Sequence, residues 1–354
     1  MTASQSRAAG PLITIAIPTY NRAPWLRGCV QSALAQSYPN FEVLVSDNAS
    51  TDGTPEVLQE FRDPRLRVVR QAANIGLMPN WNACIAAARG DYIVFVPDDD
   101  RIAPWMLERC ADLLAREDDL TMVVALNDLH LTQENRTLPP ARSRTLRTGI
   151  HQGAGIFLEY LKGDLSVQLC SLLMRTDLLR QQGGFASDWP YAGDTAAWGR
   201  ILMTGRAGLV NESCATFAWH DDSATSQYSI GDRIDSGRRF IAVLEEAADR
   251  DLADPKMRRD IKRQTRGYVA RDVIGVITSY RKSGASLIAV LPALLQCRRE
   301  IGLSGFGIGQ AAGLARQLAI ILLPRFASGR IARFKQMLRM RSGGVADSYR
   351  GNHA

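Results

Sequence analysis

The sequence predicts an α/β fold in which a mostly parallel β-sheet is flanked by helices and followed by a C-terminal helical extension. Short β-branched runs alternate with stretches of helical periodicity over about the first 126 residues. This spacing is typical of parallel, three-layer sheets. From about residue 228 the pattern is helical to the end, without a second α/β unit.

Five strands and four helices are expected in the first part. The strands are short apolar runs at 12–17, 41–45, 66–69, 93–96 and 122–126. The helices have capping or proline residues near their starts and lie at 23–36, from 51 or 54 to about 61, at 79–89 and at 104–116. The polar, Arg- and Pro-rich residues 127–150 are predicted to form a long loop, after which helices and strands resume.

Polar residues follow three of these strands at the point where each strand ends. They are Pro18 to Arg22, Asp47 to Ser50, and Asp98 to Asp100. Ligands of parallel α/β sheets bind outside the carboxyl ends of the strands. We therefore expect the three clusters to face one crevice.

The carboxylate triplet ends the segment YIVFVPDDD at residues 92–100. Adjacent carboxylates at the end of a buried strand repel one another and destabilise it unless a cation lies nearby. A hard divalent ion takes oxygen ligands and often shares them with substrate phosphates. A solvated acidic turn is the alternative for a triplet in isolation.

The composition is that of an ordinary globular protein, with 354 residues, 46% hydrophobic and 22% charged, which argues against disorder. The six cysteines form no CxxC pair, so neither a zinc site nor a disulfide framework is expected. Buried thiols in a reducing compartment are expected instead. No signal-peptide core and no run of roughly 18 apolar residues is present, and we expect a cytoplasmic protein.

Four motifs stand in order: ITIAIPTYNR at 13–22, VLVSDNASTDGT at 43–54, RQAANIG at 70–76 and YIVFVPDDD at 92–100. In this order and spacing they resemble family 2 glycosyltransferases, the inverting enzymes of GT-A fold, over roughly 220 residues. The resemblance implies a catalytic domain at 1–227, with a nucleotide-sugar half at 1–126 and an acceptor half at 127–227, and a basic helical region at 228–354. It also implies transfer of a single sugar from a nucleoside-diphosphate sugar to an acceptor hydroxyl in bacterial surface polysaccharide or glycolipid synthesis.

The resemblance assigns the donor contacts residue by residue. Asp47 matches the acidic residue that hydrogen-bonds the nucleobase, although capping of the following turn is an alternative. Arg70 is expected to reach the base or a phosphate, or else to form a surface salt bridge, and Gly76 to give backbone clearance. The donor-binding residues implied are Pro18, Thr19, Tyr20, Arg22, Asp47, Asn48, Arg70, Asn74, Gly76 and Asp98.

The carboxylate triplet matches the metal and ribose motif of this fold, with Pro97 in place of a further aspartate. The resemblance gives Asp98 to the ribose and Asp99 to Mn²⁺ or Mg²⁺, with Asp100 as a second ligand or a structural partner. The sequence alone does not separate these three roles. His220, which opens HDDSATS, is similar to a histidine that contacts the diphosphate or the metal.

A single inverting displacement needs one carboxylate to take the acceptor proton. In GGFASDWPYAGDTAAWGR at 183–200, Asp194 matches the base of the family, and Gly193 replaces the usual glutamate before it. Capping of a helix is the alternative role of Asp194, and Asp188 is the rival base. The acceptor-binding candidates are the aromatic residues Trp189, Tyr191 and Trp198, with core packing as an equal alternative for Trp198.

The net charge of +7 is divided unevenly. Residues 255–354 hold 19 Lys/Arg against 4 Asp/Glu, whereas residues 1–254 hold 24 against 32. The apolar runs 287–295 and 318–323 are flanked by basic residues, and 330–341 repeats Arg/Lys among apolar side chains. Such helices can lie on an anionic membrane surface.

A peripheral site at the inner membrane face would suit a saccharide or lipid-linked saccharide acceptor. A helical cap on the catalytic domain and an oligomer contact are the alternatives for the basic region. No nucleic acid partner is expected, because the chain shows no aromatic platform or recognised motif for one.

A non-catalytic nucleotide-sugar binding or scaffold protein is the alternative function, and the departures at Pro97 and Gly193 favour it. A nucleotidyltransferase would require a Gly-rich phosphate loop with a lysine after the first strand, which IPTYNR lacks. The absence of a QxxRW-like motif after Asp194 favours a single transfer over repeated transfer.

Overall fold

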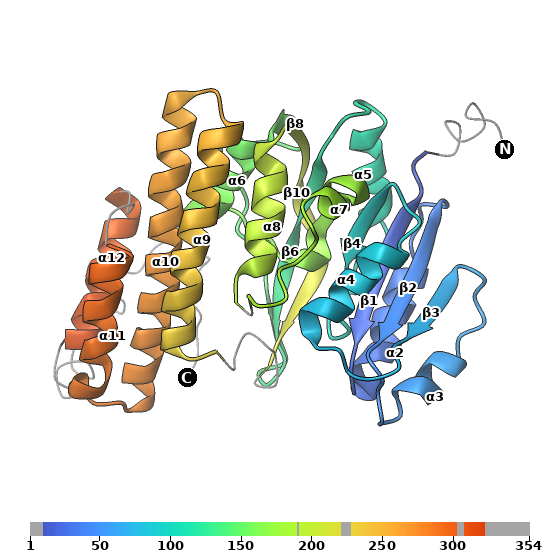
Figure 1. Ribbon diagram of the computed structural model, residues 1–354, viewed down its shortest axis with the longest axis horizontal. Coiled ribbons are helices and arrows are strands. Elements are labelled where there is room, and N and C mark those ends of the chain that lie inside the picture. Colours follow the sequence, from blue (N-terminus) through green and yellow to red (C-terminus); the bar gives the residue numbers. More distant parts are fainter. Residues whose placement is uncertain (1–9, 190, 221–227, 303–307, 323–354) are drawn as a thin grey trace, which may run out of the picture.

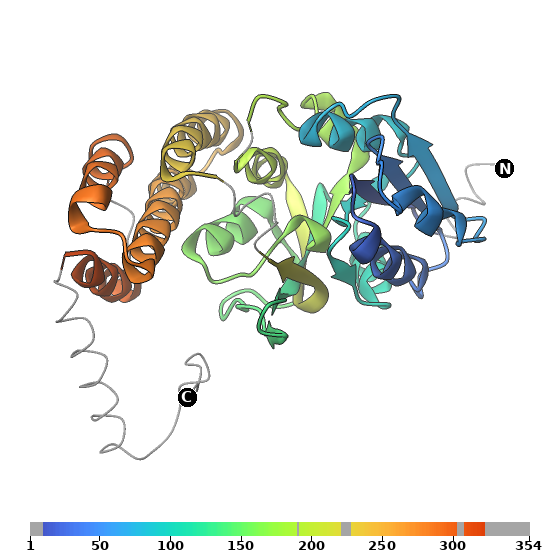
Figure 2. The same ribbon diagram turned by 90° about the horizontal axis from the view of Figure 1, so that it is seen from below.

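The computed structural model describes residues 10–189, 191–220, 228–302 and 308–322. A ten-stranded sheet crosses the molecule in the order β3-β2-β1-β4-β9-β6-β10-β5, with β7 paired to β6 and β8 to β10. The long helices α9 to α12 stand together at one end of this sheet (Figures 1 and 2). The predicted α/β class with a C-terminal helical extension is confirmed.

The first strands form the parallel part of the sheet. They are β1 (Ile13–Thr19), β2 (Phe41–Asp47), β3 (Leu66–Arg70) and β4 (Tyr92–Phe95). Every residue of β1, β2 and β4 is buried, because helices cover both faces of a parallel sheet. The intervening helices are α2 (Ala23–Leu34), α3 (Thr54–Gln59) and α4 (Leu77–Ala87).

The second part of the sheet is mixed. Its elements are β5 (Arg101–Ile102), α5 (Met106–Leu114), β6 (Met122–Leu131), β7 (Arg136–Leu138), β8 (Gly149–Gln152), α6 (Gly153–Lys162), η1 (Leu169–Ser171), β9 (Leu172–Arg175), α7 (Thr176–Gln181), α8 (Gly193–Met203) and β10 (Arg206–Trp219). Strand β9 runs antiparallel to both β4 and β6, whereas β6 and β10 are parallel. The expected parallel order therefore holds for the first four strands and for the β6–β10 pair.

The predicted loop over 127–150 is wrong in part. Strand β6 continues to Leu131, where it pairs with β10 on one side and with β7 on the other. Strand β8 pairs with the first residues of β10. These segments are polar because consecutive residues on both faces of the ladder are only partly buried or exposed, so backbone hydrogen bonds and not apolar periodicity mark them as strands.

The C-terminal helices pack on the rest of the fold. They are α9 (Ile230–Asp251), α10 (Pro255–Ser283), α11 (Leu287–Glu300) and α12 (Ile308–Leu322). Phe240 of α9 and Ile274 of α10 belong to the same apolar cluster as Phe157 of α6 and Trp198 of α8. Helix α9 begins at a capping box formed by Ser229 and Asp232, which satisfies backbone donors at its first turn.

Several sequence predictions concern positions outside the described residues. The domain boundary at 227 falls there, as do the end of the 318–323 run and the basic segment 330–341. None of the described helices is both long and apolar enough to cross a membrane. All six cysteines are buried and free, as expected.

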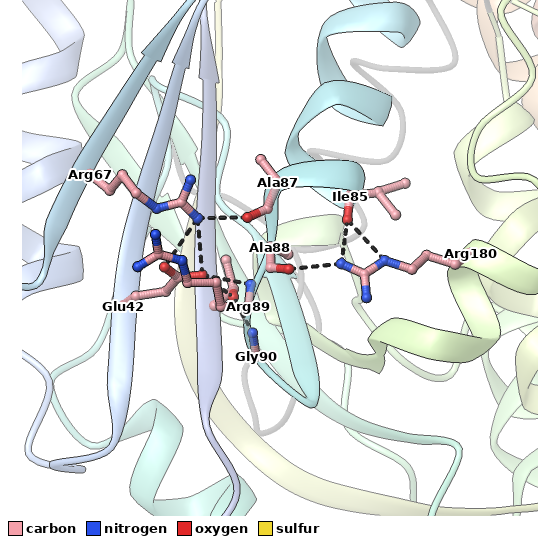
Figure 3. A network of polar contacts seen from close by, with 9 residues as sticks. Glu42, Arg67, Ile85, Ala87, Ala88, Arg89, Gly90 and Arg180 are labelled. Carbon is pink, nitrogen blue, oxygen red and sulfur yellow. Dashed lines mark hydrogen bonds and ion pairs between the residues drawn. The ribbon is translucent and has the colours of Figure 1, made fainter.

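Glu42, at the start of β2, is the centre of a buried polar network (Figure 3). Its Oε1 accepts hydrogen bonds from Thr14 Oγ1 and from the backbone N–H of Arg89, both at 2.8 Å. Its Oε2 lies 3.2 Å from Nη2 of Arg67. The residue is 8% exposed, so these partners replace water around the carboxylate.

The same network holds the C-terminus of α4. Nη2 of Arg67 donates to the carbonyl of Ala87 at 2.6 Å, and Nη2 of Arg180 on α7 donates to the carbonyl of Ala88 at 2.7 Å (Figure 3). The last carbonyls of a helix have no partner within the helix. Two guanidinium groups therefore fix α4 against β3 on one side and against α7 on the other.

We expect Glu42→Ala to lower the free energy of unfolding by about 2–4 kcal/mol, because Thr14 and Arg67 would lose a buried charged acceptor. Urea denaturation measures this change. Glu60→Ala is the control, since it breaks the exposed Arg27–Glu60 pair and should cost less than about 1 kcal/mol. Equal losses in the two variants would contradict this account of the network.

Candidate active site

A cavity of about 600 Å³ lies at the carboxyl ends of β1 and β4. All three polar clusters predicted from the sequence contribute to it, and α8 faces it from the other side. The sequence-predicted residues that line it are Pro18, Thr19, Tyr20, Arg22, Asn48, Asn74, Gly76, Asp98, Asp99, Asp100, Tyr191 and Asp194. The parallel strands therefore form the crevice that their order predicts.

The three carboxylates after β4 are held close together and largely buried. Burial, followed by the charge of Asp99, raises the pKa of Asp98 to about 7. The same two causes raise the pKa of Asp100 well above its usual range. Oδ2 of Asp99 lies 2.8 Å from Nε2 of His220. Burial is the larger cause of both shifts, and repulsion from the neighbouring carboxylate adds to it.

The turn that carries these carboxylates is braced by β10 and by Arg101. The backbone N–H of Ala218 donates to Oδ1 of Asp100 at 2.9 Å, and Nη1 of Arg101 donates to the carbonyl of Asp100 at 2.7 Å. The ring of His220 stacks on Trp25 with centroids 5.0 Å apart. The carboxylates are therefore held in place before any ligand binds.

The side chains at the end of β4 fit the ligand preferences of a hard divalent ion in part. Carboxylate oxygens and one imidazole suit Mn²⁺ or Mg²⁺. The buried Oδ2 of Asp100 has no partner with hydrogen-bond geometry in the described part of the chain. The Cys170 thiol lies beside the Asp100 carboxylate. No group of three or more His, Cys, Asp or Glu that could hold an ion occurs among the residues described. A Mg²⁺-type ion commonly takes one or two carboxylates and completes its shell with phosphates and water.

Asn48 shapes the loop on the donor side of the cavity. Its Oδ1 accepts from the backbone N–H of Ile75 at 2.9 Å, and its Nδ2 donates to Oδ1 of Asn74 at 2.8 Å. Gly76 has a φ of 92°, a conformation that favours glycine. This backbone requirement explains Gly76 without the clearance expected from the sequence, because an added Cβ would make only ordinary contacts within the protein.

Asp47 and Arg70 pair with each other and do not line the cavity. Oδ2 of Asp47 lies 2.7 Å from Nη1 of Arg70. Oδ1 of Asp47 accepts from the backbone N–H of Ser50 at 2.9 Å, which is the turn-capping alternative that the sequence left open. A contact of either side chain with a nucleobase stays a prediction.

Asp194 lies in the first turn of α8 and faces the cavity. Burial raises its pKa above the usual range. The residue before the helix, Ala192, has a left-handed φ of 62°. The departure at Gly193 has a packing reason, because an added Cβ would lie only 3.2 Å from Cγ of Trp189. The rival base Asp188 is exposed and pairs with Arg239 at 3.0 Å.

The three aromatic acceptor candidates lie in different surroundings. Tyr191 lines the cavity, whereas Trp189 and Trp198 are buried and do not. Trp198 packs edge-on against Phe157 and Tyr160, with centroids 5.3 and 4.7 Å apart, so the structure supports core packing over acceptor contact. Arg239 lies over the ring of Trp189 at 4.7 Å, so one face of this ring is covered by the protein.

Among the further residues that line the cavity, five at its helical end were not indicated by the sequence. They come from α6, α9, α10 and the segment before α9, and they are Tyr160, Tyr228, Arg233, Tyr268 and Asp272. The only local signal is that residues 268 and 272 lie four apart and hence on one face of a helix. Nothing in the sequence shows that this face meets the cavity.

Residues 14–165 match the family model described as Glycosyl transferase family 2. An uncharacterized Mycobacterium tuberculosis protein is 29% identical over 205 residues, which are 55% of this chain and 63% of that protein. The putative teichuronic acid biosynthesis glycosyltransferase TuaG of Bacillus subtilis is 35% identical over 101 residues, 28% of this chain and 40% of its own. The chain thus spans less than two thirds of the length of these curated relatives.

Two solved structures share the fold. Staphylococcus aureus TarS in complex with UDP-GlcNAc has a TM-score of 0.63 and 16% identity, covering 82% of this chain and 80% of that one. The mannosyltransferase PcManGT from Pyrobaculum calidifontis, in complex with GDP-Man and Mn²⁺, has a TM-score of 0.53 and 21% identity, with 89% and 86% coverage. At these identities the likeness establishes the GT-A fold alone.

We expect Asp194→Asn to stabilise the protein near neutral pH relative to the native chain. In the unfolded chain this carboxyl loses its proton near its ordinary pKa of about 3.9, whereas in the folded protein it loses it at a higher pH. Between these values the folded state binds more protons, so native stability falls as pH rises. Thermal melts at about pH 4 and about pH 7 should show the relative melting temperature of the variant rising with pH.

Asp188→Asn is the control with the opposite sign. The hydrogen bond from Arg239 lowers the pKa of Asp188, so this variant should lose stability relative to the native chain as pH rises. A relative melting temperature of Asp194→Asn that falls or stays constant with pH would contradict the burial account.

Proposed function

We propose, from the match of residues 14–165 to the family model described as Glycosyl transferase family 2, that the protein is an inverting glycosyltransferase. It moves one sugar from a nucleoside-diphosphate sugar to an acceptor hydroxyl. The observation that carries this proposal is the placement of two kinds of carboxylate around one cavity. A charged cluster ends β4, and a separate carboxylate, Asp194, enters from α8.

Asp194 serves as the general base of a single displacement. The acceptor hydroxyl gives its proton to Asp194 while its oxygen attacks the anomeric carbon. The bond from that carbon to the diphosphate oxygen breaks on the opposite face, and its electron pair leaves with the diphosphate. Burial moves the pKa of Asp194 upward, toward the operating pH at which a general base is most effective.

The donor occupies the strand end of the cavity in this proposal. Asp98 binds the ribose, and half-exposed Tyr20 packs with Thr19 and Arg22 around the nucleoside. Asp99, Asp100 and His220 would hold Mn²⁺ or Mg²⁺, which when bound neutralises the charge of the leaving diphosphate. Support for this comes from Oδ2 of Asp100, which is buried without a hydrogen-bond partner in the described part of the chain. The charge of Asp99 also adds to burial in raising the pKa of Asp98 and of Asp100.

One of the two departures from the family pattern, at Gly193, has a local structural reason and does not require a loss of activity. Gly193 accommodates the ring of Trp189. The carbonyl of Pro97 accepts hydrogen bonds from the thiol of Cys29 at 3.4 Å and from the backbone N–H of Asp100 at 2.9 Å, but any residue could make these contacts, and nothing in the structure explains the proline itself. The contact at Gly193 weakens the argument for a non-catalytic binding protein.

The biological setting that we propose is surface polysaccharide or glycolipid synthesis at the inner face of the membrane. The relative named for teichuronic acid biosynthesis supports a polymer or its lipid-linked precursor as the acceptor. The boundary between a catalytic unit and a basic helical region near residue 227 remains part of this proposal.

We expect Asp194→Asn to lose sugar transfer by at least about a hundredfold, because a general base typically contributes that much, and to keep donor binding. Binding is measured by thermal shift with UDP, GDP, dTDP or CMP, with and without Mn²⁺. A ligand at a hundred times its Kd stabilises the fold by about 2.7 kcal/mol.

Two variants control this measurement. Asp99→Ala should lose the metal-dependent thermal shift, and Asp188→Asn should change neither binding nor transfer. A protein that binds nucleotide yet shows no transferase activity in any variant, native chain included, would instead support the non-catalytic alternative.

Membrane contact is expected through α11. Ile288, Leu291 and Leu295 share one face of this helix and are 84%, 37% and 54% exposed, and Arg298 and Arg299 follow in its last turn. An exposed apolar stripe next to basic residues suits an anionic surface. Ile288→Ser with Leu295→Ser should reduce co-sedimentation with anionic vesicles, and unchanged co-sedimentation would rule out this face.

A further inference from the structure

We infer that the helical end of the cavity is a subsite for one uncharged sugar ring of the acceptor, and that α9 and α10 build it. The inference rests on the proposed function, because it takes Asp194 as the group that receives the acceptor proton. Helices α9 and α10 lie beside α6 and α8 (Figures 1 and 2). All the residues that carry the inference lie outside 14–165 except Tyr160.

Four tyrosines make this end of the cavity aromatic. Tyr160, Tyr191, Tyr228 and Tyr268 all line it, and each is only partly buried. The rings of Tyr191 and Tyr228 meet edge to face at 5.5 Å, and the hydroxyls of Tyr160 and Tyr268 lie 2.8 Å apart. Tyrosine combines an apolar face with a polar tip. Such a wall matches a sugar ring, whose C–H face is apolar and whose edge carries hydroxyls.

Arg233 positions two members of this wall. Its Nη1 lies 3.1 and 3.2 Å from the two carboxylate oxygens of Asp272 and donates to the hydroxyl of Tyr191 at 2.6 Å. Its guanidinium carbon also lies 4.4 Å from the centroid of the Tyr191 ring. Arg233 is 6% exposed, so its guanidinium group interacts with protein groups and hardly with bulk solvent.

Asp272 keeps part of its carboxylate accessible. Its side chain is 28% exposed, against 6% for that of Arg233. Each carboxylate oxygen has more than one lone pair, so the ion pair leaves capacity for a hydroxyl donor from the cavity. Asp272 is therefore the group of this wall best placed to accept a hydrogen bond from the acceptor ring.

The charge balance selects the kind of sugar. Of the described residues that line the helical end, Arg233 is the single cation, and it is paired with Asp272. Asp194 adds a second carboxylate to the same wall. A uronate or a phosphorylated ring would bring its anion against these carboxylates without a matching cation, which is unfavourable in a partly desolvated site. An uncharged hexose or N-acetylhexosamine meets no such cost.

The experiment compares two ion pairs that both join α9 to α10. Asp272→Asn weakens the pair in the cavity, whereas Glu245→Gln weakens the Arg266–Glu245 pair, 2.8 Å long, which does not line it. The probes are nitrophenyl glycosides of neutral hexoses and N-acetylhexosamines, with the glucuronide as the anionic probe. The donor is the nucleotide sugar whose diphosphate stabilises the native protein.

We expect the native protein to use at least one neutral glycoside in preference to the glucuronide. Asp272→Asn should raise the KM for that glycoside about tenfold, as expected for the loss of a charged hydrogen bond, while the donor-induced thermal shift persists. Glu245→Gln should leave the KM unchanged. Tyr191→Phe, which removes one hydroxyl and keeps the ring, should raise the KM in the same direction and covers the case in which Asp272→Asn fails to fold.

Preference for the glucuronide, use of no neutral glycoside by a protein that hydrolyses its donor, or equal KM values in Asp272→Asn and Glu245→Gln would each overturn the subsite. A native protein that neither hydrolyses nor binds any nucleotide sugar would overturn the proposed function itself. The donor measurements without acceptor thus separate the two failures.

Discussion

Repulsion among three carboxylates at the end of β4 is the constraint on which the arrangement of the site depends. Asp98, Asp99 and Asp100 lie where a parallel sheet brings its strand ends together. The protein relieves the repulsion only in part, through His220 at Asp99 and the N–H of Ala218 at Asp100. Both of these partners come from the end of β10. These two contacts join the second half of the sheet to the first. The carboxylate cluster that they hold favours a cation.

The opposite wall of the cavity depends on a different balance. Asp194 is a carboxylate whose burial disfavours its charged form, and it stands in a helix preceded by a left-handed alanine, Ala192. A buried charge and a strained backbone each lower stability, and they commonly coincide at functional sites. Packing of α8 against α6 and α9 supplies the stability that offsets these costs.

The helical extension is accordingly part of the cavity as well as a covering for the core. Arg233 and Asp272 span α9 and α10 and contact Tyr191, three residues before Asp194. The strand end of the cavity carries three carboxylates with Arg22, whereas the helical end is aromatic with its one described cation paired. Two chemically distinct ends suit two different substrates of one reaction.

The sequence by itself determined the alternation of strands and helices and the crevice at the strand ends, because these depend on local periodicity and on the order of parallel strands. The residues proposed to bind the donor came from the resemblance of its motifs to a known family. That resemblance also singled out Asp194 within a short motif. Only the tertiary structure decided that Asp47 pairs with Arg70, that Trp198 packs in the core and that β6 extends through a polar segment. Only the tertiary structure, too, joined Arg233 to Asp272 and Tyr160 to Tyr268. Such contacts join residues far apart in the chain, and which face of a helix meets a distant partner is set by packing and not by the local pattern.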